Sequence, residues 1–99
     1  MVVPNEIREQ DGKWQVLVDD PPKWITCQTK AYAQAIAHAP VLVHKVEDLG
    51  ERGEDLAKRL DLASKAMELS IVGNEMIGTC PVSRWYSALA TKARGEENK

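Results

Sequence analysis

Residues 54–71 read EDLAKRLDLASKAMELSI, and this stretch has the strongest helical pattern in the chain. At 100° per residue one apolar stripe forms, made of Leu56, Leu60, Ala63, Met67 and Ile71. Leu62, Ala66 and Leu69 widen the apolar arc, so that only a narrow polar strip is left. A helix of this kind cannot bury its apolar surface from one side. We therefore expect it to be the central element, packed against a sheet and other helices, or with the edge of Leu62 and Leu69 turned to a partner.

Three strands are predicted ahead of this helix, at residues 7–10, 13–18 and 23–26. An aspartate–glycine pair at positions 11–12 predicts a tight hairpin, and the prolines at 21–22 end the second strand because they lack donors. The result is an antiparallel meander. In the middle strand the face that we expect to be buried holds Trp14, Val16 and Val18. In the third strand, alternation leaves open whether Ile25 or Trp24 faces inward.

Two further helices are predicted. Thr29 is a suitable N-cap for a helix from residue 30 to about residue 49, and Pro40 predicts that this helix is kinked or divided. Thr79 and Pro81 predict the start of a last helix, whose apolar stripe contains Val82, Trp85, Tyr86, Leu89 and Ala93. The fold class is therefore α+β, a three-stranded antiparallel meander followed by three or four packed helices. We expect a single domain over residues 1–95 and a frayed polar tail at 96–99.

Composition limits the kinds of partner. The chain has 99 residues and a net charge of −2, which removes the long-range attraction shown by a generic nucleic-acid or membrane-surface domain. It contains no run of eighteen apolar residues and no signal-like start, so we expect a cytoplasmic protein without membrane association. There are three tryptophans and no phenylalanine, so we expect Trp14, Trp24 and Trp85 to dominate the packing of large residues.

No pattern in the sequence names a reaction. Cys27, Cys80, His38 and His44 are the residue types of a zinc site, but the cysteines lack a nearby partner cysteine. Cys80 before Pro81 sits where a helix dipole lowers a thiol pKa, although a capping cysteine packed against the core is the commoner arrangement. No nucleophile elbow, phosphate loop or dinucleotide fingerprint is present. We predict no enzymatic activity, no metal and no cofactor, and two free thiols.

Charged residues gather in two places. The first is an acidic segment made of Glu47, Asp48, Glu51, Glu54 and Asp55. It is either a solvated loop with favourable helix-start charges or an acidic surface for a partner with a basic groove. The second is the last helix, where Arg84, Lys92 and Arg94 accompany two aromatic residues and no acid.

Residues 12–16 (GKWQV), 24–26 (WIT) and 29–33 (TKAYA) loosely resemble the three-stranded, helix-backed arm-binding domains of tyrosine recombinases. The resemblance covers about the first third of the chain and implies a hairpin followed by a helix. Those domains present a basic sheet face. Residues 1–30 here hold four basic and five acidic side chains, so we take no DNA-binding role from the resemblance.

These observations favour a small intracellular protein that acts by binding another protein. Small acidic domains of this kind are common among accessory and inhibitor proteins of bacteria and phages, including blockers of host defence. The residues that we expect to contact the partner are Glu47, Asp48, Glu51, Glu54, Asp55, Trp24 and Arg84. The alternative is a sequence-tolerant nucleic-acid-binding domain. A homodimer through Leu62 and Leu69 is compatible with both.

Overall fold

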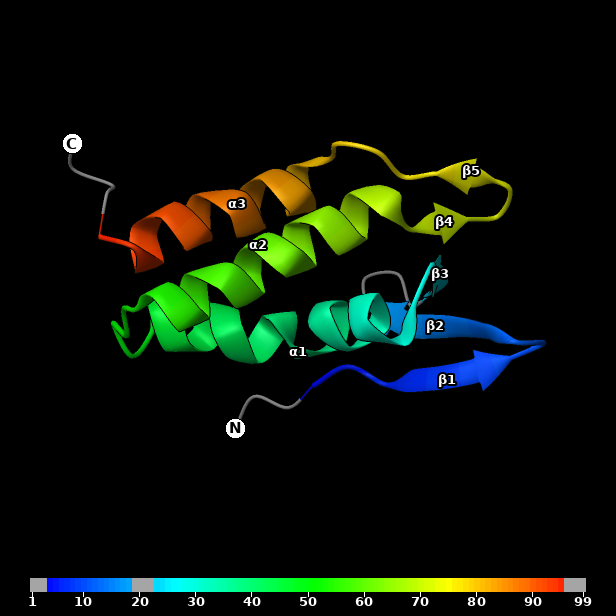
Figure 1. The fold of residues 1–99 in the computed structure, drawn as a ribbon, viewed down its shortest axis with the longest axis horizontal. Helices are drawn as coiled ribbons and strands as arrows, with labels where there is room; N and C mark the ends of the chain where they lie inside the picture. Colours follow the sequence, from blue (N-terminus) through cyan, green and yellow to red (C-terminus); the bar gives the residue numbers. More distant parts are fainter. Residues whose placement is uncertain (1–3, 19–22, 96–99) are drawn as a thin grey trace.

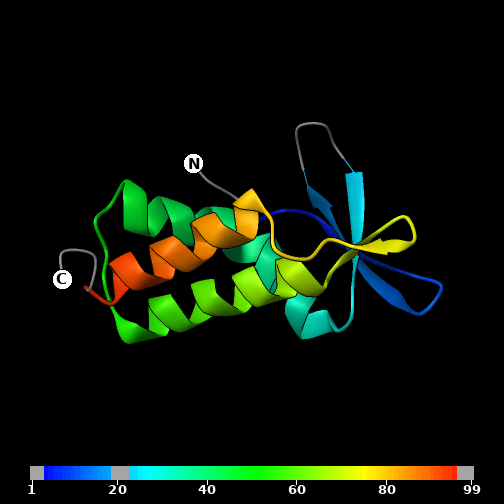
Figure 2. The ribbon, with the colours of Figure 1, turned by 90° about the horizontal axis from the view of Figure 1, so that it is seen from above.

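The helix predicted to be central lies between the other two helices of a three-helix bundle in the view of Figure 1, and a sheet lies at one end of the bundle (Figures 1 and 2). The structure is a computed structural model, and it describes residues 4–18 and 23–95. The central helix α2 (Glu54–Leu69) contacts α1 (Lys30–Glu47), α3 (Pro81–Ala93) and strand β3. Because it touches elements on several sides, its wide apolar arc is largely buried, as the sequence predicts.

The sheet has five antiparallel strands in the order β1-β2-β3-β4-β5. Their bounds are β1 Ile7–Gln10, β2 Lys13–Val18, β3 Lys23–Cys27, β4 Ile71–Val72 and β5 Glu75–Met76. The α+β class and the β1–β3 meander are confirmed, and Gly12 has the positive φ of 77° that a tight hairpin needs. The predicted turn at residues 19–22 and the predicted tail at 96–99 lie outside the described residues.

The count of three strands was too low, because a second hairpin follows α2. The helix ends at Leu69, so Ile71 does not belong to its stripe as predicted; it pairs instead with Thr26 of β3 and Met76 of β5. Gly73, with a φ of 64°, makes the turn between β4 and β5. Each of these strands has two residues, too few to show an alternating pattern. The sequence therefore showed only a break where the structure adds two strands.

The third strand turns Ile25 and Cys27 toward the helices, which settles the alternative that the sequence left open. Both side chains are buried, whereas Trp24 and Thr26 are half-buried on the other face. Val16 of β2, paired with Ile25, is also fully buried. The inner face of the sheet is thus the face predicted from the middle strand.

Helix α1 begins as predicted, with the Thr29 hydroxyl accepting a hydrogen bond of 3.1 Å from the Tyr32 N–H. It runs without interruption through Pro40, so of the two predicted alternatives, a kinked or a divided helix, the divided one is wrong. Pro40 cannot donate to the carbonyl four residues earlier. The next carbonyl, that of Ala37, accepts a hydrogen bond of 2.8 Å from the N–H of Asn5, which attaches the segment before β1 to this turn of α1.

Helix α3 begins at Pro81, but its cap is Cys80 and not Thr79. The Cys80 Sγ accepts from the Ser83 N–H at 3.4 Å, and the Ser83 Oγ accepts from the Cys80 N–H at 3.0 Å. The buried face of α3 is also rotated from the predicted stripe. Ser83 and Ala90 are buried, while Val82 and Trp85 are exposed.

Two clusters of buried residues form the core. One joins the sheet to α1, α2 and α3 and includes Val16, Ile25 and Ile36. The other lies within the helix bundle around Leu60, Val46 and Leu89. Alanine supplies eight of the eighteen buried apolar residues, so the helices pack closely. The prediction that tryptophans dominate the packing is wrong, because two are half-buried and Trp85 is 47% exposed.

Candidate protein-binding groove between two helices

The acidic segment surrounds the loop between α1 and α2, and most of its carboxylates have partners within the chain. The ion pairs are Glu47 with Lys92 (3.6 Å), Asp48 with His44 (2.7 Å), Glu54 with Arg94 (3.2 Å) and Asp55 with Arg59 (3.3 Å). Two of these pairs reach from the segment to α3. The acids therefore have a structural role, which a sequence reading could suggest only as helix-start charge. Their predicted role in partner binding stays a prediction.

Arg94 forms the most connected of these pairs. Its guanidinium lies 3.2 Å from Glu54 and 2.5 Å from Asp61, so it joins the end of α3 to the first two turns of α2. The hydrogen bond to Asp61 and the nearby carboxylates raise the pKa of Arg94. This basic residue at the end of the last helix is thus engaged in ion pairs with α2.

Trp24 lies on the outer face of the sheet, away from the helices. The Arg8 guanidinium lies 3.9 Å from the centre of its ring, and the Arg8 Nε donates to the Gln15 Oε1 at 2.7 Å. Gln15 in turn donates to the Thr26 hydroxyl at 3.2 Å. One face of the indole is therefore covered by an arginine of the same sheet.

The other predicted contact residues are spread over two helices. Arg84 is exposed on α3 beside Trp85, whose ring stacks on Tyr86 with centroids 5.8 Å apart. On α2, Leu62 is 40% exposed, whereas Leu69 is half-buried near the sheet. Of the predicted residues, Leu62 lines the larger of two hollows between α1 and α2, and Glu51 and Asp55 line the smaller one.

The cysteines and histidines serve separate local structures. The Cys27 thiol is buried 3.6 Å from the Ser70 hydroxyl, and burial raises its pKa while the hydrogen bond opposes the rise. Cys80 caps α3, and His44 pairs with Asp48. Across residues 4–18 and 23–95, no three His, Cys, Asp or Glu side chains are grouped as metal ligands. Both cysteines are free thiols.

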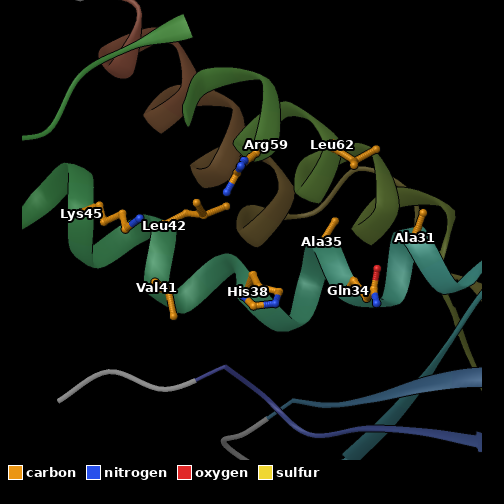
Figure 3. Close-up of a pocket in the computed structure, with 9 residues that line it drawn as sticks. All are labelled: Ala31, Gln34, Ala35, His38, Val41, Leu42, Lys45, Arg59 and Leu62. Atoms are coloured by element: carbon orange, nitrogen blue, oxygen red, sulfur yellow. The ribbon is translucent and has the colours of Figure 1, made fainter. Parts of the chain in front are cut away.

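A groove of about 340 Å³ runs between α1 and α2 (Figure 3). Its lining consists of Ala31, Gln34, Ala35, His38, Val41, Leu42, Lys45, Arg59 and Leu62. The seven residues from α1 recur every three or four positions, so they form one stripe of that helix. In Figure 3, Arg59 points from α2 toward α1 near Leu42, and Leu62 lies farther along α2. Two rigid helices thus hold the groove in place.

The charge of this groove is basic. His38, Lys45 and Arg59 lie among its apolar residues, and no carboxylate is part of the lining. A second, smaller hollow shares Leu42, Lys45 and Arg59 with it and continues toward Gly53. Carboxylates occur only at that end, where Asp55 pairs with Arg59 at 3.3 Å. The two hollows together form a long surface that has an apolar floor and basic side chains.

Of the residues that line the larger groove, only Leu62 was among those predicted from the sequence. The signal that was available is a second stripe in residues 30–47, beside the buried one. It consists of small, apolar and basic residues at helical spacing, which by themselves are also typical of a solvated helix face. Only the position of α2 shows that this stripe forms one wall of a groove.

Comparisons with known proteins add no family. No protein-family model, curated protein or solved structure matches the chain. In the part of the chain that the structure describes, no helix is both long and apolar enough to span a membrane. A function for this chain therefore has to be inferred from the geometry of its surface.

Proposed function

We propose that this chain is a non-enzymatic protein of the accessory or inhibitor type, which acts by binding another protein. The observation that carries the proposal is the groove between α1 and α2. It combines an apolar floor, in which Leu62 remains 40% exposed, with basic side chains on two helices. Elongated grooves between helices are typical sites for helical segments of partner proteins.

The chemistry of the groove favours binding over catalysis. Its described lining offers no thiol, hydroxyl or carboxylate, so His38 has no nucleophile or acid beside it there. Elsewhere, Glu54 and Asp61 of α2 pair with Arg94 at the end of α3, and Glu47 of α1 pairs with Lys92 of α3. The two free thiols fit a reducing compartment, which agrees with a role inside the cell.

Site-specific photo-crosslinking tests the proposal. A benzoylphenylalanine replaces Gln34, which is exposed in the groove, and in a matched variant it replaces Ala88, which is exposed on α3. After irradiation of cells that make the protein, we expect a defined protein adduct from position 34 and none from position 88. The absence of any adduct at position 34 would refute the proposal.

Nuclease treatment separates this proposal from nucleic-acid binding. An adduct at position 34 that disappears after nuclease would favour the alternative of a sequence-tolerant nucleic-acid binder. An adduct that persists, and that mass spectrometry identifies as one protein, supports protein binding.

A further inference from the structure

The dimensions of the groove limit its occupant. Its lining on α1 extends from Ala31 to Lys45, which at 1.5 Å per residue is about 21 Å, or about four helical turns. Two helices form its walls, so an occupant packed between them would complete a layer of antiparallel or crossed helices. A helix of about fourteen residues matches this length.

The floor of the groove favours an apolar helix face. At one end Ala31 and Ala35 project little, so the backbone of an occupant can come close. Toward the middle, Leu42 and Leu62 supply larger apolar surface, and the exposed fraction of Leu62 is not used within the chain. Apolar side chains spaced i, i+4, i+7 and i+11 on one helix would meet these positions in turn.

The charges determine which kind of helix fits. Lys45 and Arg59 approach the floor, and the described lining of the main groove contains no carboxylate. Arg59 also pairs with Asp55 at 3.3 Å, at the end where the smaller hollow begins. An occupant with carboxylates beside its apolar stripe would be attracted, and a basic one repelled. Two copies of this chain docked groove to groove would place like charges against each other, so the charges disfavour a second copy as occupant.

We infer that the groove binds an acidic amphipathic helix of the partner protein, with apolar side chains on Ala35, Leu42 and Leu62 and carboxylates at Lys45 and Arg59. This inference rests on the proposed function, and it specifies the class of partner. It also reverses the charge relation expected from the sequence. The basic side belongs to this chain, and the acidic side belongs to the partner.

Designed peptides test the inference directly. The probe is a fluorescein-labelled helical peptide of about sixteen residues, with leucine at i, i+4, i+7 and i+11 and glutamate and alanine elsewhere. Its counterpart has lysine in place of every glutamate and the same leucines. By fluorescence anisotropy we expect the glutamate peptide to bind at least about tenfold more tightly, with an affinity that falls as salt is added. Equal binding of the two peptides would overturn the inference.

Matched variants locate the binding. Arg59→Glu and Leu62→Glu should each weaken binding of the glutamate peptide by at least about fivefold. Lys13→Glu makes the same charge change as Arg59→Glu at an exposed position of β2 outside both hollows, and it should leave the affinity unchanged. If Lys13→Glu weakens binding as much as Arg59→Glu, the peptide responds to net charge only and the inference fails. If Leu62→Glu does not fold, Gln34→Trp replaces it, because it fills the groove from an exposed position. This variant should also weaken binding of the glutamate peptide.

The peptide and crosslinking experiments together separate failure of this inference from failure of the proposed function. A protein crosslinked at position 34 combined with no preference for the glutamate peptide refutes the inference and leaves protein binding intact. Specific peptide binding without any cellular adduct supports the inferred chemistry while refuting the function. A dimer in sedimentation equilibrium that Leu62→Glu converts to monomers would assign the groove to a second copy and overturn the inference.

Discussion

Leu60 and Leu62 are two residues apart on α2, yet the structure gives them different surroundings. Leu60 is fully buried in the bundle core, and Leu62 is 40% exposed in the groove. Leu60→Ala removes about three methylene equivalents at about 0.8 kcal/mol each, or about 2.4 kcal/mol. The cavity left between three helices adds about 1 kcal/mol or more, so we expect a loss of about 3–4 kcal/mol.

For Leu62→Ala, the loss of about 0.8 kcal/mol per methylene applies only to the buried part of the side chain, and no closed cavity forms. We expect a loss of about 1 kcal/mol. Because a domain of this size has a total stability of about 5–15 kcal/mol, the first variant loses a large share of it and the second does not.

Equilibrium unfolding in guanidinium chloride measures both variants, with equal m-values as the control for two-state behaviour. We expect the two losses to differ by at least about 1.5 kcal/mol, with Leu60→Ala also lowering Tm by at least about 12 °C. A loss below about 1 kcal/mol for Leu60→Ala would refute its place in the core. Equal losses for the two variants would refute the distinction between core and groove.

Three further predictions follow from the packing and the thiols. Ala63→Leu should destabilise by about 1–3 kcal/mol in thermal melts because it overpacks a closed site, whereas exposed Ala88→Leu should change stability by less than about 0.5 kcal/mol. Cys80→Ala should lose about 0.5–2 kcal/mol of helix capping, and Cys80→Ser should retain it, as urea unfolding would show. Burial raises the pKa of Cys27 above its ordinary 9.0, so the unfolded thiol loses its proton first as the pH rises. The free energy of unfolding should therefore decrease as the pH rises above about 9.0. The Cys27→Ala variant should lack the share of this decrease that comes from the Cys27 thiol.

The elements that the sequence predicted well are those with a long and regular pattern. The strands up to Cys27 and the helix starting after Thr29 have alternation, turn residues or a cap that act locally. The hairpin after α2 has a turn glycine, Gly73, but its two-residue strands are too short to show alternation. Ile71 of its first strand pairs with Thr26 of β3, more than forty positions earlier, and that contact leaves no mark on the local pattern.

The tryptophans show a different limit. Residue size predicts how much area a side chain can bury, but it does not predict whether neighbouring elements leave room for it. Here the helices approach one another through alanines such as Ala57 and Ala90, and that close approach leaves no space for an indole between them. Trp85 consequently lies at the surface, and a smaller residue, Ser83, takes the buried side of α3.

The groove could be predicted from α2 but not from α1, and the difference has a physical reason. Leu62 was noticeable because a leucine outside the buried stripe has apolar area that no predicted neighbour covers. Ala31 and Ala35 gave no such signal, since alanine favours helix formation at exposed and buried positions alike. Their small size defines the hollow only after Leu62 is placed near them by the packing of α2 on α1 (Figure 3). The binding surface is thus a property of the pair of helices, and so its charge and length could be argued only from their arrangement.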